Sequence, residues 1–278
     1  MRSLQVVVLR MLAVAHQTKN DAISTVDGYQ QSFYNMTFGV DNHINKDFVI
    51  GTAVSWQQSS ARGGAGLNGD SVNVSTPEIT GYGSYRYGPA YVNGILGFGY
   101  NTYHESRDIQ FINSTATASY HGVQYMGKIE TGWDYSYEDI IITRLMGFDA
   151  VHTFNQSYTE TGAGVADESV KSQAINSYAT TLGGKIATTF TSAWGDLTPA
   201  LKLVWVHDLL RGPITTDATL AGVGFATTTA RVSQNGAQIG FSTMLQEDDD
   251  LSISAEYDGD LRQGYSSHSG QIKVKWDF

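Results

Sequence analysis

The sequence is dominated by long segments in which apolar and polar residues alternate. A period of two residues predicts a β-strand with one apolar and one polar face. Nearly all of these segments reach the nine to eleven or so residues that a tilted strand needs to cross a bilayer, and most exceed the five or six usual in soluble sheets. About twelve of them follow one another, at residues 4–17, 29–42, 47–58, 74–87, 90–104, 115–135, 140–155, 173–192, 197–210, 231–245, 250–262 and 268–278.

The connections between these segments alternate between short turns and longer polar loops. Short turns lie at 42–46, 88–89, 138–139, 194–196 and 246–249, and longer segments lie at 59–73, 105–113, 156–171 and 211–230. In an up-and-down barrel every second connection lies on the same rim, and outer-membrane barrels keep their tight turns on the periplasmic side. The pattern therefore predicts an all-β fold, a closed antiparallel up-and-down transmembrane β-barrel of about 12 strands with both chain ends on the short-turn rim.

The four prolines agree with this prediction. Pro77, Pro89, Pro199 and Pro213 fall in loops, in turns or in the first few residues of a predicted strand. A barrel strand has two bonded neighbours, so a missing backbone donor is tolerated only at such positions.

Length and composition narrow the class of protein further. All-β barrels commonly reach this length as one domain, and with no linker in sight we expect a single domain over residues 1–278. The chain has no apolar run near the eighteen or so residues of a transmembrane helix, so it is either soluble or spans by strands. It has no cysteine, which excludes disulfides and thiolate sites, and its formal charge of -10 argues against a nucleic-acid partner.

The two faces of the predicted strands differ in chemistry. On the apolar face, near the short-turn rim, we expect a periplasmic-side aromatic girdle made of Phe48, Tyr85, Tyr87, Trp133, Tyr135 and Trp276. On the other face we expect lumen-facing polar residues, namely Arg86, Gln124, Lys128, Glu130, Lys202 and Gln238. We also expect a lumenal salt-bridge ladder. It either props the barrel interior, which is the favoured role, or contacts a helix within the lumen, and its members are Lys128, Glu130, Asp134, Arg144 and Asp149.

The two ends of the chain are informative. Ile272, Val274, Trp276 and Phe278 share one parity of the last segment, and a terminal aromatic on such a strand resembles the C-terminal assembly signal of Gram-negative outer-membrane barrels. That resemblance implies recognition by the barrel assembly machinery, although Lys273 stands where the signal usually has a small residue.

Residues 1–16 mimic a signal peptide, but a charge within the apolar run favours a first strand instead. We therefore expect the C-terminal part of a longer precursor.

The chain resembles the β-domain of monomeric autotransporters, the type Va secretion proteins. The resemblance extends from about residue 10 to residue 278 and rests on segments 36–56, 81–109, 197–207 and 252–278, with Tyr-Arg-Tyr-Gly before a tight turn as a specific feature. It implies a monomeric outer-membrane barrel, surrounded by outer-membrane lipid, that anchors and helps to export an N-terminal passenger. The family's lumenal helix before the first strand is absent or reduced to the opening residues.

Two other functions remain open at this point: a stand-alone outer-membrane channel of the porin kind, and a soluble β-sandwich binding module. We expect no enzymatic activity and no cofactor. Gly69-Asp70-Ser71 and His207 could supply a serine nucleophile and its base, but one lies in a predicted loop and the other on the apolar face of a strand. The seven histidines show no metal-ligand spacing.

Overall fold

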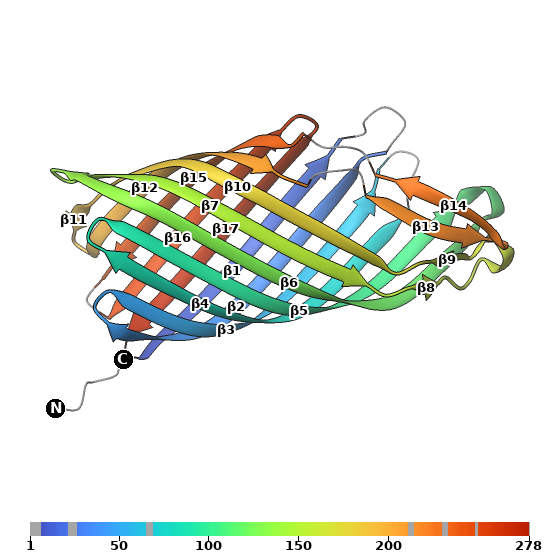
Figure 1. Ribbon diagram of the computed structural model, residues 1–278, viewed down its shortest axis with the longest axis horizontal. Coiled ribbons are helices and arrows are strands. Elements are labelled where there is room, and N and C mark those ends of the chain that lie inside the picture. Colours follow the sequence, from blue (N-terminus) through green and yellow to red (C-terminus); the bar gives the residue numbers. More distant parts are fainter. Residues whose placement is uncertain are drawn as a thin grey trace.

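The computed structural model describes residues 7–21, 27–64, 69–210, 214–229, 233–247 and 250–277, and most of them form strands (Figure 1). The strands are β1 (Val7–Asn20), β2 (Tyr29–Asn45), β3 (Phe48–Gly63), β4 (Ser71–Tyr87), β5 (Ala90–Ile109), β6 (Ser114–Tyr137), β7 (Ile140–Asn155), β8 (Tyr158–Thr159), β9 (Glu168–Val170), β10 (Gln173–Thr188), β11 (Phe190–Ser192), β12 (Gly195–Asp208), β13 (Thr215–Leu220), β14 (Val223–Thr228), β15 (Asn235–Gln246), β16 (Leu251–Arg262) and β17 (Tyr265–Asp277). The described helical segments are two short 3-10 turns, η2 (Gln110–Ile112) and η3 (Gly164–Ala166).

Twelve strands form a closed antiparallel barrel. Strands that follow one another along the barrel wall are hydrogen-bonded neighbours, in the order β10-β7-β6-β5-β4-β3-β2-β1-β17-β16-β15-β12, and β10 pairs with β12 to complete the circle. The short β11 continues β10 beyond Thr189 and keeps the same register against β12. The prediction of a closed up-and-down barrel of about 12 strands is confirmed.

The first and last strands are joined along their whole described length. The register between β1 and β17 runs from Val8 opposite Asp277 to Asn20 opposite Tyr265. Both termini therefore lie at one end of the barrel (Figure 1), which we call the terminal rim, and the opposite end is the far rim. The predicted first strand is confirmed from Val7 onward, while residues 1–6 lie outside the described residues.

Connections at the terminal rim are short, as the sequence predicts. The β4–β5 turn uses Gly88 at a φ of 58° and the β6–β7 turn uses Glu138 at a φ of 50°. At the far rim two predicted loops are largely strand, because β3 extends to Gly63 and β5 continues to Ile109 before η2. The prediction of a loop over residues 105–113 is therefore wrong. Polar residues beyond the apolar band do not end a strand whose neighbours still supply hydrogen-bond partners.

One proline departs from its predicted place. Because β4 already begins at Ser71, Pro77 lies in the strand interior. The β4–β5 ladder is interrupted there, resuming at Glu78 opposite Gly99, as expected for a residue without a backbone donor. The prediction holds for Pro89, which occupies a turn, and Pro213 lies outside the described residues.

A second, four-stranded sheet stands at the far rim (Figure 1). Its order is β14-β13-β9-β8, so the connection between β7 and β10 pairs with the connection between β12 and β15. The last far-rim connection, between β16 and β17, is only a tight turn with Gly264 at a φ of 72°. The far rim is thus uneven, with a tall structured side and a low side.

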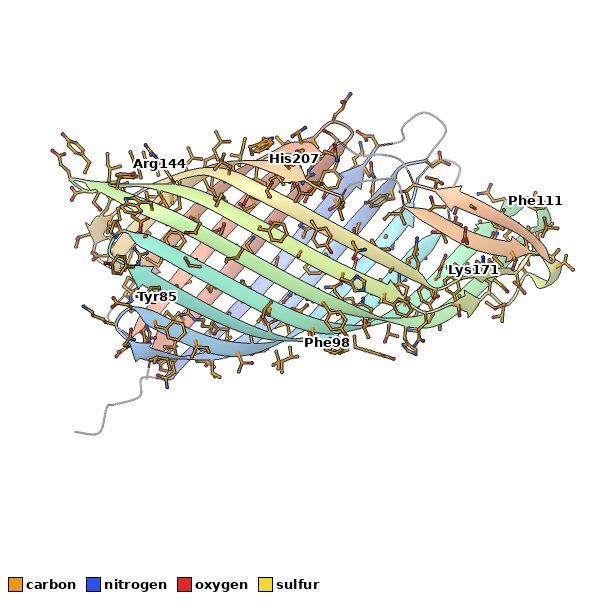
Figure 2. All side chains as sticks on the ribbon, viewed as in Figure 1. Tyr85, Phe98, Phe111, Arg144, Lys171 and His207 are labelled. Carbon is orange, nitrogen blue, oxygen red and sulfur yellow. The ribbon has the colours of Figure 1, made fainter. Side chains whose placement is uncertain are left out.

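The barrel reverses the usual distribution of polarity. Large apolar side chains point away from the barrel wall, as Phe98 and Tyr85 do in Figure 2, and Leu96 is 73% exposed. Inward positions hold small and polar residues, and Asp41 is only 3% exposed. An apolar surface of this extent on every strand is unsuited to water and suited to lipid. A soluble β-sandwich would bury these side chains, so that alternative is wrong.

In the part of the chain that the structure describes, no helix has the length and apolar character that a membrane crossing by a helix would require.

Two inward tyrosines pack directly on glycines of the barrel wall. A Cβ at Gly51 would lie 2.4 Å from the Tyr82 ring, and a Cβ at Gly132 would lie 2.4 Å from the Tyr91 ring. Each of these two inward tyrosines therefore covers the glycine directly opposite it on the neighbouring strand. The missing side chains let bulky rings lie flat against the inner wall.

We predict different costs for arginine on the two faces. Leu96→Arg should destabilise the barrel in bilayer vesicles by about 2 to 4 kcal/mol, because the new charge faces the hydrocarbon, whereas Gln124→Arg faces the polar interior and should cost far less. The free energy of unfolding of both variants, measured by denaturant titration in vesicles, tests this. Equal costs would show that the two faces are wrongly assigned.

Candidate functional site

The candidate site is the barrel interior, whose inward side chains form a polar lumen. Near the terminal rim the Arg10 guanidinium bonds to the Asp41 carboxylate, which also accepts the Tyr82 hydroxyl at 2.9 Å. Beside it, Arg86 Nη1 lies 2.8 Å from Asp134 Oδ2. These contacts join residues from strands one or two apart, so they brace the wall from inside.

Midway along the lumen, two lysines pair with carboxylates. Lys202 Nζ lies 3.0 Å from Glu256 Oε1 and 2.8 Å from Asp258 Oδ1. Three strands away from β12, on β6, Lys128 Nζ lies 2.9 Å from Asp149 Oδ1. Such pairing lowers the cost of keeping charges in a partly desolvated interior.

Toward the far rim one ion-pair cluster is almost fully enclosed. Arg262 bonds to Asp208 across the β15 strand and to Asp260 at 3.0 Å on its own strand. The Arg262 and Asp208 side chains are 6% and 9% exposed. The lumen thus presents charges of both signs, held in place by their partners.

The predicted lumen-facing residues lie as follows. Glu130 accepts the Tyr91 hydroxyl at 3.2 Å, and Arg86, Lys128 and Lys202 form the pairs described above. Gln124 and Gln238 are half-buried, the first opposite Gly99 and the second opposite Val204.

Arg144 does not belong to the predicted lumenal ladder. It is exposed, pairs with Trp133 across the β6–β7 hairpin, and lies 5.0 Å from the centre of the Tyr135 ring. Figure 2 places it at the outer edge of the barrel. The β6–β7 turn fixes the register, and the register puts Arg144 on the same outward face as Trp133. The ladder prediction is wrong for this residue, while Lys128 and Asp149 do pair.

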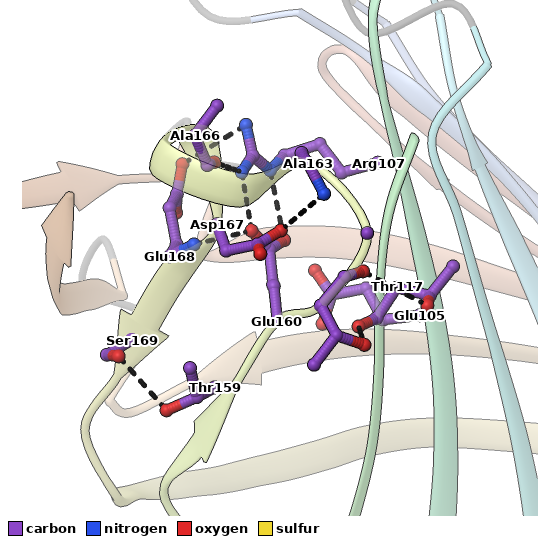
Figure 3. A network of polar contacts seen from close by, with 12 residues as sticks. Glu105, Arg107, Thr117, Thr159, Glu160, Ala163, Ala166, Asp167, Glu168 and Ser169 are labelled. Atoms are coloured by element: carbon purple, nitrogen blue, oxygen red, sulfur yellow. Dashed lines mark hydrogen bonds and ion pairs between the residues drawn. The ribbon is translucent and has the colours of Figure 1, made fainter. Parts of the chain in front are cut away.

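At the far rim, a guanidinium ties the β7–β10 connection to the barrel wall (Figure 3). Arg107 Nε donates to Glu160 Oε1 at 3.0 Å, and Arg107 also bonds to the Ala166 carbonyl oxygen at 2.8 Å and lies 3.3 Å from Glu168. The guanidinium reaches over the inner face of β6, where the intervening side chain at Ala116 is small and fully buried.

Stacked tyrosines reinforce the same connection. Tyr103, Tyr120 and Tyr158 come from β5, β6 and β8, with ring centres 4.6 Å and 4.0 Å apart. Tyr158 donates its hydroxyl to Glu105 at 2.8 Å. Burial raises the pKa of the Tyr158 hydroxyl, and the nearby Glu105 charge raises it further. Burial likewise raises the pKa of the Glu168 carboxyl, although Arg107 opposes the change.

Sequence reasoning missed this far-rim network and part of the aromatic set. Parity identifies Arg107 as inward, but nothing in the sequence connects it with Glu160, 53 positions away. Trp194, which is 79% exposed in the β11–β12 turn, was also missed because turn residues have no strand parity. A count of aromatic residues in the short turns would have found it.

The predicted girdle residues lie on outward positions near the terminal rim. Phe48 meets Tyr85 edge to face with ring centres 6.5 Å apart, and Trp133 lies 6.4 Å from Tyr135. Tyr87 is exposed at the end of β4.

The predicted C-terminal signal lies on β17. Ile272, Val274 and Trp276 point to its outward face, and Trp276 pairs with Leu9 of β1 and Leu251 of β16. Phe278 lies outside the described residues.

The residues considered for a nucleophile and base are not brought together. Ser71 begins β4, whereas His207 stacks on Trp205 with ring centres 5.4 Å apart and contacts Asn235 on β15. β4 and β12 are not neighbours in the barrel.

A closed barrel of twelve strands with a polar, internally paired lumen and both ends on one rim defines a class of outer-membrane β-barrel. Residues 11–258 match the family model described as the autotransporter beta-domain, and the chain belongs to this family. It is an outer-membrane β-barrel, and barrels of this kind keep the rim with the short turns on the periplasmic side. Its surroundings are therefore those of the outer membrane.

Similar proteins agree with this assignment. The chain is 22% identical over 279 residues to outer membrane protein B of Rickettsia japonica, covering 95% of this chain and 16% of that protein. The translocator domain of the autotransporter NalP from Neisseria meningitidis has the same fold, with a TM-score of 0.77 and 14% identity over 99% of this chain and 90% of that one. The β domain of the Bordetella autotransporter BrkA has a TM-score of 0.75 and 15% identity, covering 99% of this chain and 100% of that one. The chain thus spans about a sixth of the rickettsial relative's length.

We predict that the far-rim connection depends on Arg107. Arg107→Met leaves the 3% exposed Glu160 side chain without its cation, a loss on the order of 3 kcal/mol for a buried pair. Residues 156–172 should then become sensitive to limited proteolysis while the barrel still shows heat-modifiable migration in gels.

The matched control is Lys171→Met, which removes an exposed ion pair with Asp217 at 3.7 Å. Exposed pairs contribute about 0 to 1 kcal/mol, so this variant should behave like the parent. An unchanged cleavage pattern in Arg107→Met would contradict the assigned role of the network.

Proposed function

We propose that residues 1–278 act as one translocator domain that anchors an N-terminal passenger in the outer membrane and helps to export it. The observation that supports this most directly is the position of β1, which begins at the terminal rim, the rim of short turns that outer-membrane barrels keep on the periplasmic side. A passenger on the cell surface must therefore be linked to β1 by a segment that crosses the membrane. The polar lumen offers a path on which this segment avoids lipid.

The charges of the lumen suit this role. Lys202 and Arg262 are neutralised by carboxylates of the barrel itself, so these two cations are not free to hold a passing chain. Rigid pairs also keep the lumen from collapsing inward. The proposed mechanism is physical, with no bond made or broken, and the domain is accordingly proposed to have no enzymatic activity.

The outer wall supports the proposals about lipid, assembly and oligomeric state. The aromatic residues near the periplasmic rim, among them Trp133 and Trp276, are proposed to form the girdle at that membrane interface. The alternating strand β17, which precedes Phe278, is proposed to be recognised by the barrel assembly machinery. Because β1 and β17 pair completely, the sheet offers no free edge to another copy, and we propose a monomer.

The experiment is a fusion of a small tagged passenger to the N-terminus, expressed in a Gram-negative host. The tag should become accessible to antibody and protease on intact cells, because the barrel supports passage to the surface. A barrel that assembles in the outer membrane while the tag stays in the periplasm would contradict the export role. Single-channel conductance without tag display would favour the stand-alone channel instead.

The same fusion tests the assembly signal when Phe278 is deleted. The deletion removes one aromatic side chain, so refolding into detergent micelles should remain close to that of the parent. Accumulation in the outer membrane should be lost because the assembly machinery no longer recognises the strand. Normal membrane levels of the truncated protein would show that Phe278 is not part of a signal.

A further inference from the structure

Arg144 is unusual among the outward side chains of the barrel. Along the outward positions of the described barrel strands, the other charged residues are Lys19, Arg62 and Asp108, which all lie at the far rim. Arg144 is the fifth residue of β7, counted from the periplasmic turn. With a rise of about 3.3 Å per residue and a tilt near 40°, it stands roughly 12 Å from that turn along the barrel axis.

The surroundings of Arg144 leave its guanidinium open on one side. Trp133 is its partner on β6, and the Tyr135 ring lies 5.0 Å from the guanidinium carbon. On β10 the partner is Gly184, which offers no side chain. The guanidinium therefore lies in a notch with aromatic residues on one side, at the level where a membrane places its headgroups. Among the described residues, the guanidinium contacts the Tyr135 ring and forms no ion pair with a carboxylate.

An apolar groove begins one outward position further into the membrane. Met146 follows Arg144 on the outer face of β7, with Thr131 opposite on β6 and Leu182 opposite on β10. These three residues help to line a groove of about 550 Å³, together with Ile129 and Phe148. Met146, the next outward residue after Arg144, lines this groove, so the cation and the apolar groove lie end to end along the barrel wall.

We propose that Arg144 and this groove form a binding site for one glycerophospholipid of the periplasmic leaflet. The lipid phosphate binds the guanidinium, and an acyl chain lies in the groove. Arginine suits this role because it stays charged, is weakly hydrated and presents paired donors to phosphate oxygens. The inference goes beyond passenger export and needs only the membrane orientation of the barrel.

Native mass spectrometry of the refolded barrel in detergent tests this site. One-to-one adducts should form with phosphatidylglycerol and with phosphatidylethanolamine, because both contain the phosphate. Diacylglycerol with the same chains should bind far less, and inorganic phosphate should not displace the lipids because it lacks the acyl chain. Equal binding of diacylglycerol, or displacement by inorganic phosphate, would overturn the proposal.

Variants separate the two halves of the site. Arg144→Gln should weaken phosphatidylglycerol binding by about tenfold, as expected for the loss of a charge-assisted contact. The affinity of Arg144→Lys should lie between those of the parent and of Arg144→Gln. Arg62→Gln, which removes an outward arginine at the far rim, is the matched control and should bind like the parent. If Arg144→Gln binds as tightly as the parent, the proposal is wrong.

A second variant keeps the test decisive if Arg144→Gln does not fold. Met146→Trp retains the cation and places a bulky ring over the start of the groove, so it should also reduce lipid binding. It leaves the lipid-facing surface apolar and should fold like the parent, as judged by heat-modifiable migration. Undiminished binding by a folded Met146→Trp barrel would exclude the groove from the site.

Discussion

The structure depends on the pairing of β1 with β17. Within hydrocarbon a sheet edge would leave a row of backbone donors and acceptors without partners, and each such group costs several kcal/mol. Thirteen residue pairs, from Val8–Asp277 to Asn20–Tyr265, remove both edges at once. Closure also requires an even number of strands in an antiparallel up-and-down barrel, which places both ends of the barrel sheet on the same rim.

Closure in lipid determines the chemistry of both faces. The outer face must be apolar, so the inner face receives the polar residues, and these must satisfy one another. Arg10 with Asp41, Lys202 with Glu256, and Arg262 with Asp208 show the result. Because each pair joins different strands, it braces the wall as well as neutralising the lumen. The interior that a passenger segment would meet is thus polar and internally balanced.

The sequence predicts the barrel well because a period of two residues survives in every spanning strand. It predicts side-chain facing less well where a turn resets the parity. Arg144 shows this, because its place follows from the two-residue turn at Glu138–Asp139, which sets it opposite Trp133. The sequence contains the information needed to place Arg144, because the apolar parity of its own strand puts Trp133 on the outer face.

Other features are beyond such reasoning. The contact of Arg107 with Glu160 joins a strand to a connection that has no periodic pattern. The polar residues before Pro77 predict a loop, so the sequence pattern places Pro77 near the start of its strand. The strand continues because hydrogen bonding to β3 is maintained, with Pro77 opposite Trp56.

The most direct test of the account is a cross-link across the closing seam. The chain has no cysteine, so Ala13→Cys and Ile272→Cys, which are partners in the β1–β17 register and both face outward, can be introduced without background. In outer membranes of intact cells, mild oxidation should link this pair and shift the migration of the denatured chain. Ala13→Cys with His268→Cys, four residues out of register, should not be linked. Failure of the first pair to form, or equal linking of both, would contradict a barrel closed in this register.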